Sequence, residues 1–123
     1  FQLERFKTHR PDAVIYNGYD EMCLGGLAMG ADGAIGTTYN FMGHLFVALY
    51  TAFHEGRMAD ALALQKRANR VIEVLIDVGV FPATKGFLKL RGFDCGECRA
   101  PFRKLDANDW RKLEACAAEY LND

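Results

Sequence analysis

The feature that most constrains the fold is a pair of short apolar runs that lie within 24 residues of one another. The first, residues 13–16, is partly β-branched and does not alternate in polarity, which is typical of a buried parallel strand. The second, residues 33–36, reads Gly-Ala-Ile-Gly. Between them, residues 21–29 fit a helix that Asp20 caps and Gly30 ends. The pattern predicts a tight β-α-β unit.

The remainder of the chain has helical periodicity. Residues 41–53 carry two adjacent apolar stripes, which indicates a helix covered on much of its surface. In residues 58–78, apolar side chains recur at spacings of 4, 3, 4 and 3, and Gly79 fits a C-cap. A shorter helix is expected from Pro82 to about Leu90, and a last one after the cap residue Asp106.

Two short parallel strands do not make a stable sheet by themselves. Parallel strands need neighbouring strands and helices on both faces, and the order helix, strand, helix, strand, helix fits the end of a (β/α)₈ barrel. A whole barrel needs roughly 250 residues, whereas this chain has 123. We therefore expect an α/β fold, a C-terminal fragment of a barrel: its last two strands and their helices in residues 1–55, then a C-terminal helical extension in residues 56–123. The chain also opens inside a helical pattern without a cap, so we expect a piece of a longer protein.

In such a barrel, active-site groups follow the carboxyl ends of the strands. This rule points to residues 17–21 and 36–40. Asp20 and Glu21 can serve the N-terminus of the helix that follows them, or they can accept hydrogen bonds from the hydroxyl groups of a polyol or sugar. Gly18 would let a ligand approach the backbone. Thr37 can contribute a hydroxyl group, or it can belong to a simple strand-to-helix turn.

Charge and composition exclude several functions. The net charge is −1 with both signs mixed along the chain, which argues against a nucleic-acid partner and against a basic membrane-binding patch. No apolar run approaches the roughly 20 residues of a membrane helix. Charged residues within the first ten positions do not fit a signal peptide. We expect a cytoplasmic protein with four free cysteines.

Several segments resemble one enzyme family. Residues 16–21 (Tyr-Asn-Gly-Tyr-Asp-Glu) and 30–40 (Gly-Ala-Asp-Gly-Ala-Ile-Gly-Thr-Thr-Tyr-Asn) resemble the N-acetylneuraminate lyase branch of the pyruvate-dependent class I aldolases. The resemblance continues through residues 75–80 and 98–102 and covers nearly the whole chain. The related dihydrodipicolinate synthases share the Gly-Ala-Asp-Gly turn, but the Asp-Glu pair is not expected in them.

The resemblance implies a (β/α)₈ barrel with extra C-terminal helices, usually a homotetramer, that reversibly cleaves sialic acid to N-acetylmannosamine and pyruvate. A lysine forms the Schiff base with pyruvate and a tyrosine moves the proton; both are expected upstream of Phe1, so no catalytic residue, cofactor or metal is expected here. Gly18, Asp20, Glu21 and Thr37 would bind the substrate's hydroxylated tail. A serine is usual at the position of Thr37, so a different 2-keto sugar acid stays an alternative, as does an inert or self-assembling barrel fragment.

Two further features lie outside these motifs. Cys95 and Cys98 form a CxxC, which is the spacing of half a zinc site or a redox pair. No second such pair exists in the sequence, and we expect no function for this one. Arg99, before Ala100-Pro101, is expected to tie down the C-terminal helix.

Overall fold

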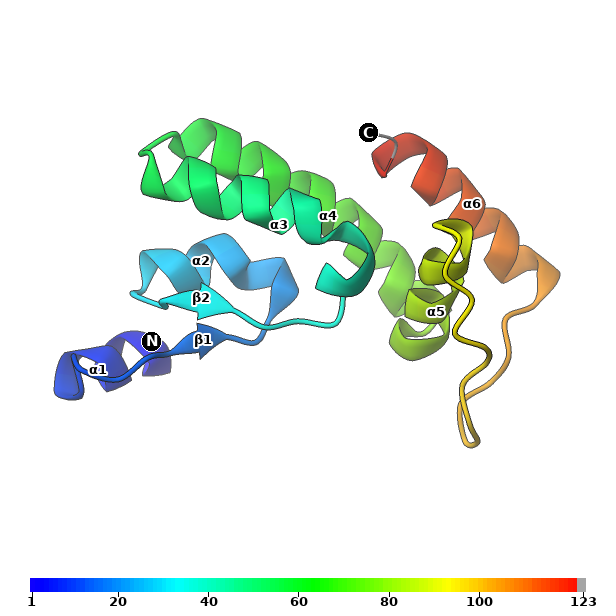
Figure 1. Cartoon of the computed structure of the whole chain (residues 1–123), viewed down its shortest axis with the longest axis horizontal. Helices are drawn as coiled ribbons and strands as arrows, with labels where there is room; N and C mark the ends of the chain where they lie inside the picture. Colours follow the sequence, from blue (N-terminus) through cyan, green and yellow to red (C-terminus); the bar gives the residue numbers. More distant parts are fainter. Residues whose placement is uncertain (122–123) are drawn as a thin grey trace.

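The computed structural model describes residues 1–121 and contains seven helical and two strand elements within them. In chain order these are α1 (Gln2–His9), β1 (Tyr16–Asn17), the 3₁₀ helix η1 (Asp20–Met22), α2 (Cys23–Ala28), β2 (Gly33–Ala34), α3 (Tyr39–His54), α4 (Met58–Val78), α5 (Val80–Leu90) and α6 (Ala107–Tyr120). Figure 1 shows α3 and α4 side by side above α2 and the two strands, with α5 and α6 beyond the far end of α4. Within residues 1–121, no helix combines the length and apolar character needed to cross a membrane.

The predicted β-α-β unit is present, with shorter strands than the sequence suggested. Strands β1 and β2 are parallel, with Tyr16 opposite Gly33 and Asn17 opposite Ala34. Asp32 fixes the start of the pair, because its carboxylate accepts from the backbone N–H of Ile15 at 2.8 Å and from Lys7 Nζ at 2.8 Å. The expectation of a fully buried strand is wrong for this chain. Tyr16 remains 55% exposed because no further strand or helix of the described residues covers that side.

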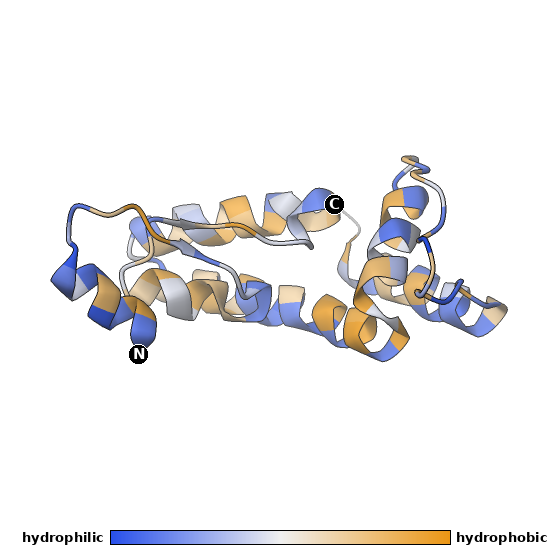
Figure 2. Cartoon of the chain, turned by 90° about the horizontal axis from the view of Figure 1, so that it is seen from below, coloured by the Kyte–Doolittle hydropathy of each residue, from blue (hydrophilic) through white to orange (hydrophobic). Residues whose placement is uncertain are grey.

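The core lies mainly between α3 and α4, which pack along most of their length. Its members are apolar side chains at helical spacing, among them Leu45, Leu49 and Ala52 of α3 and Ala68, Val71 and Leu75 of α4. In Figure 2 hydrophobic and hydrophilic residues alternate along the helical ribbons, as expected for helices with one buried side. The two stripes predicted for residues 41–53 are therefore explained by contacts with α2, α4 and α5.

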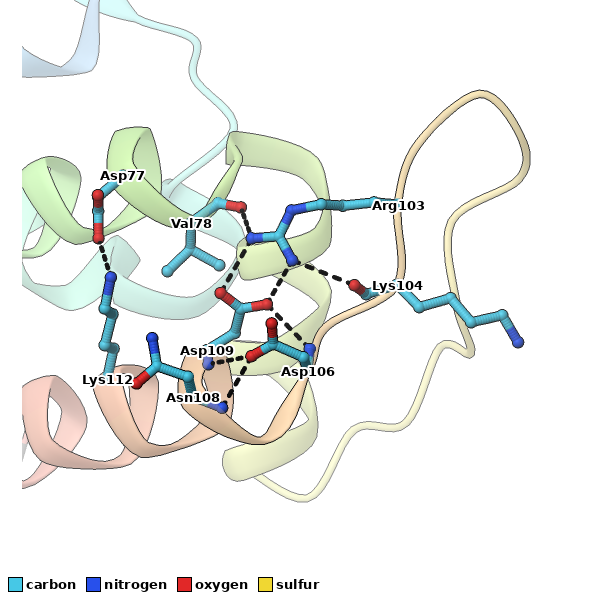
Figure 3. A network of polar contacts seen from close by, with 8 residues as sticks. All are labelled: Asp77, Val78, Arg103, Lys104, Asp106, Asn108, Asp109 and Lys112. Atoms are coloured by element: carbon cyan, nitrogen blue, oxygen red, sulfur yellow. Dashed lines mark hydrogen bonds and ion pairs between the residues drawn. The ribbon is translucent and has the colours of Figure 1, made fainter.

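The C-terminal helices are joined through a sharp corner and a polar network. Gly79 ends α4 with φ +113°, a conformation that disfavours other residues, and α5 begins at the next residue. Asp106 caps α6 as predicted, in a capping box with Asp109. Arg103, not Arg99, ties this helix down: its guanidinium pairs with Asp109 and donates to the carbonyl of Val78 at 2.8 Å (Figure 3). The Arg99 prediction is wrong because that side chain is exposed on the connecting loop.

Candidate functional site

The segments that follow β1 and β2 lie together, because parallel neighbouring strands end at the same edge. Asp20 connects them. Its Oδ2 atom accepts from the backbone N–H of Thr38 at 3.0 Å and from the Thr38 hydroxyl at 2.6 Å, and the side chain is 7% exposed. The prediction that Asp20 caps the helix directly after it is wrong, since no side-chain cap is present there. The carboxylate instead binds Thr38, the residue directly before α3.

The second oxygen of Asp20 lies against the backbone of Gly36. A Cβ atom added at Gly36 would lie only 1.5 Å from Asp20 Oδ1, so only glycine fits at this position. Asp20 Oδ1 is buried and has no hydrogen-bond partner within residues 1–121. A buried carboxylate oxygen without a donor is unfavourable. The site therefore holds a buried carboxylate oxygen whose capacity to accept a hydrogen bond is not used by the described residues.

A second layer of contacts comes from α4. Gln65 is 6% exposed, and its amide accepts from Leu24 N at 2.9 Å and donates to the carbonyl of Asp20 at 3.1 Å. The same amide donates to Asn69 Oδ1 at 2.8 Å, and Asn69 Nδ2 donates to the carbonyl of Glu21 at 3.3 Å. Two side chains of α4 thus hold the backbone of both acidic residues.

Gln65 was not identified from the sequence, although a signal for it exists. The buried positions 61, 65, 68, 72 and 75 of α4 follow the spacing 4, 3, 4, 3, and Gln65 is the polar residue among them. A polar residue on an otherwise apolar helix face must find buried partners. Those partners, in η1 and α2, lie more than 40 positions away in the sequence.

The turn before Asp20 is held by Asn17. This buried side chain donates to the carbonyl of Tyr19 at 2.6 Å. Gly26 of α2 makes room for it, since a Cβ there would lie 2.6 Å from Asn17 Cγ. By contrast, no atom lies within 4 Å of a Cβ built on Gly18. The backbone is therefore fixed on one side of the turn and open at Gly18.

Glu21 and Thr37 are the accessible polar groups of this site. Glu21 is exposed, and its carboxylate has no hydrogen bond or ion pair to another residue within 1–121. Thr37 is half-buried, and its carbonyl accepts from Asn40 Nδ2 at 2.8 Å. The structure thus brings together all four residues predicted from the sequence, with Asp20 buried at the centre and Gly18, Glu21 and Thr37 more accessible around it.

Tyr39 adds a buried hydroxyl group beside Asp20 and Cys23. Burial is the main cause that raises the pKa of Tyr39, and the neighbouring Cys23 and Asp20 act in the same direction. Its hydroxyl makes no hydrogen bond of standard geometry within residues 1–121, although Cys23 and Asp20 lie close enough to act on its pKa. The phenol therefore stays protonated at neutral pH and remains available as a donor.

No lysine side chain follows β1 or β2 at this site. Residues 11–65 contain no lysine, so none follows either strand. Lys7 is engaged by Asp32 and by the carbonyl of Ala13. In the part of the chain that the structure describes, no group of three or more His, Cys, Asp or Glu residues is placed to hold a metal ion. The arrangement can accept and donate hydrogen bonds to hydroxyl groups, but it offers no nucleophilic amine.

Comparison with known proteins relates this geometry to one family. The sequence profile of the Dihydrodipicolinate synthetase family matches residues 2–119. An N-acetylneuraminate lyase of Rhizobium meliloti (strain 1021) is 56% identical over 121 residues, which are 98% of this chain and 40% of the relative. The chain thus spans about two fifths of the length of such relatives.

Solved structures give the same relation. N-acetylneuraminate lyase from Fusobacterium nucleatum complexed with pyruvate superimposes with a TM-score of 0.93 and 33% identity, over 98% of this chain and 41% of that chain. A Clostridium difficile structure, CdNal in complex with mannosamine, superimposes with a TM-score of 0.92 and 28% sequence identity. The match covers 96% of this chain and 41% of that chain. The predicted fold class, a fragment of the (β/α)₈ barrel of these enzymes, is confirmed.

Proposed function

The chain belongs to the dihydrodipicolinate synthetase family, and from this premise we propose that it is the substrate-recognising part of an N-acetylneuraminate lyase. The complete enzyme would cleave N-acetylneuraminate reversibly to N-acetylmannosamine and pyruvate. The 56% identity to a lyase of that name over 98% of this chain supports the proposal.

One observation carries the assignment of the site: the Gly18-to-Glu21 turn is rigidly held at the edge where β1 and β2 end. Four side chains fix it, namely Asn17, Thr38, Gln65 and Asn69. Such a turn presents acceptors in a fixed geometry, which reduces the entropy lost when a flexible polyol binds. Glu21 would accept from substrate hydroxyls directly, Gly18 would offer backbone groups, and Thr37 a hydroxyl.

Asp20 would have two functions in this scheme. Its Oδ2 holds Thr38, and its Oδ1 is the unpaired acceptor beside Gly36. A substrate hydroxyl group that reached Oδ1 would supply the missing donor, so binding would satisfy a buried group that is unpaired without ligand. Interactions of that kind discriminate strongly for a hydroxylated substrate.

The bond-breaking step needs a Schiff-base lysine and a proton-transferring tyrosine. We expect both in the part of the relatives that this chain does not span, so residues 1–123 alone would be inactive. Residues 1–55 would be the last β-α units of the barrel and residues 56–123 its helical extension. The complete protein would be a cytoplasmic homotetramer that requires no cofactor.

A second substrate is suggested by one residue. Thr37 retains a hydroxyl group but adds a methyl group to the position where the family usually has a serine. The extra methyl narrows the space for the tail of the substrate, which favours an aldolase for another 2-keto sugar acid.

A pyruvate-release assay tests the proposal. The complete polypeptide that carries this sequence is offered N-acetylneuraminate and, separately, other 2-keto sugar acids, and borohydride is used to trap pyruvate on the enzyme. Release from N-acetylneuraminate at the highest kcat/KM supports the lyase; higher kcat/KM for another sugar acid selects the second candidate. If no substrate releases pyruvate and nothing is trapped, the aldolase assignment is wrong.

A further inference from the structure

Two buried polar atoms of the site have no hydrogen-bond partner within residues 1–121: Asp20 Oδ1 and the hydroxyl oxygen of Tyr39. The first belongs to a carboxylate, which accepts hydrogen bonds, and the second carries a proton that it can donate. Because native proteins pair most of their buried polar groups, an unpaired donor and an unpaired acceptor in one cluster require an explanation. Their complementary chemistry indicates that they serve each other.

Tyr39 is close to Asp20 both along the chain and in the fold. It directly follows Thr38, whose backbone N–H and hydroxyl both donate to Asp20 Oδ2. Burial raises the pKa of the Tyr39 hydroxyl, and the neighbouring Cys23 and Asp20 raise it further, so both neighbours lie close to the phenol oxygen. The protonated hydroxyl is therefore within reach of the Asp20 carboxylate.

The ring of Tyr39 is held on one side and has room on another. It packs against Phe46, with the ring centroids 4.2 Å apart. A cavity of about 260 Å³, lined also by Cys23, adjoins the ring. Met42, with φ −130° and ψ 31°, interrupts α3 after its first turn, and Figure 1 shows that turn out of line with the rest of the helix. The ring can therefore move towards Asp20 without moving the body of α3.

Cys23 competes with Asp20 for the Tyr39 hydroxyl. Its thiol is buried, and burial raises its pKa, so it stays a neutral thiol at neutral pH. Sulfur is a weak acceptor, whereas a hydrogen bond from a hydroxyl to a carboxylate is charge-assisted and roughly twice as strong as a neutral one. The carboxylate is therefore the favoured acceptor.

We propose that Tyr39 is a positioning residue for sugar-acid recognition, whose hydroxyl donates to Asp20 Oδ1 in the complete protein. With Thr38 on Oδ2 and Tyr39 on Oδ1, the carboxylate is fixed at both oxygens. A carboxylate oxygen can accept more than one hydrogen bond, so a substrate hydroxyl can share Oδ1 with Tyr39. The effect on substrate binding rests on the proposed lyase function, whereas the bond between the two side chains does not.

Tyr39→Phe tests the positioning role, because it removes the hydroxyl and keeps the ring. In the complete protein, KM for N-acetylneuraminate should rise roughly fivefold, since Asp20 loses one charge-assisted hydrogen bond, while kcat and the Kd of pyruvate stay unchanged. The matched control is Tyr50→Phe, which removes another hydroxyl of α3. That hydroxyl donates to the carbonyl of Asp32 at 3.3 Å, before β2, and its loss should leave KM unchanged. Equal KM values in the two variants, or an equal weakening of pyruvate binding, overturn the proposal.

A double-mutant cycle tests the bond without an assay of activity. The urea midpoint of unfolding is measured for Tyr39→Phe alone and in the Asp20→Ala and Cys23→Ala backgrounds. We expect Tyr39→Phe to lower the midpoint in the wild-type and Cys23→Ala backgrounds, and to lower it by less than about half as much in Asp20→Ala. The same lowering in all three backgrounds, or a lowering that disappears only in Cys23→Ala, contradicts the bond between Tyr39 and Asp20.

The two measurements separate this proposal from the lyase assignment. If the complete protein releases pyruvate from no sugar acid, the lyase proposal fails, and the cycle still decides whether Tyr39 binds Asp20. If pyruvate is released but Tyr39→Phe leaves KM unchanged, the positioning role is wrong and the lyase proposal stands.

Discussion

Gln65→Leu is the change that most directly tests how the Asp20–Glu21 turn is held. Leucine is similar in size but removes an amide that makes three hydrogen bonds, to Leu24 N, Asp20 O and Asn69 Oδ1. Leaving a buried polar group without its partner costs about 1–3 kcal/mol. Two backbone groups lose theirs here, and leucine regains part of the loss through apolar burial. We expect the free energy of unfolding to fall by about 2–3 kcal/mol.

The measurement is urea-induced unfolding of the complete protein followed by circular dichroism, with KM for N-acetylneuraminate measured in parallel. Lys66→Leu is the matched control, since it makes the same new side chain at the exposed neighbouring position and should change stability by less than about 0.5 kcal/mol. The variant Gln65→Leu should also raise KM for the sugar acid, because the turn loses its support. Equal unfolding midpoints for the two variants would refute the reasoning.

Three further predictions rest on single contacts. Gly36→Ala should lower the free energy of unfolding by about 1–3 kcal/mol and weaken sugar-acid binding, because the added methyl group displaces the Asp20 carboxylate. An unchanged unfolding midpoint together with an unchanged KM would contradict this. The Arg103 guanidinium lowers the pKa of Asp109 from its usual 3.8 to about 2. This pair therefore stabilises the fold fully above about pH 4 and progressively less towards pH 2. The loss of stability in Arg103→Met, measured by denaturation at several pH values, should become smaller between about pH 4 and pH 2 and stay constant above about pH 4. Thr37→Ser should change the ratio of kcat/KM between N-acetylneuraminate and other 2-keto sugar acids without altering pyruvate binding, which competition assays can determine.

The helical part of the fold was predictable because its signals are local. The 4, 3, 4, 3 spacing of α4, the positive φ of Gly79 at its end and the Asp106 cap of α6 each depend on residues within a few turns of one another. The strands were predicted too long and too buried. Their hydrophobic character reflects neighbouring strands that the described residues do not include, so sequence pattern alone overstated what this chain can cover.

The site was predictable as a location but not as a set of contacts. The rule that active-site groups follow barrel strands predicted Gly18, Asp20, Glu21 and Thr37 at one edge, where the structure has them, and their role in binding stays a prediction. It did not show that Asp20 binds Thr38, 18 positions later, instead of its own helix, or that Gln65 supports the turn from α4. The Arg99 prediction was wrong for the same reason: several arginines occur near α6, and only the path of the loop selects Arg103. Long-range polar pairs depend on the tertiary fold, which local pattern does not specify.

Under the proposed function, the Gly18-to-Glu21 turn binds the hydroxylated part of the substrate and not its pyruvate part. The direct measurement is the affinity of the complete protein for N-acetylneuraminate and for pyruvate in Glu21→Gln, with Glu114→Gln, an exposed change on α6, as control. Loss of a charged hydrogen bond should weaken sugar-acid binding by about 1.5–3 kcal/mol and leave pyruvate binding unchanged. An equal loss for both ligands, or no loss for either, would contradict the claim.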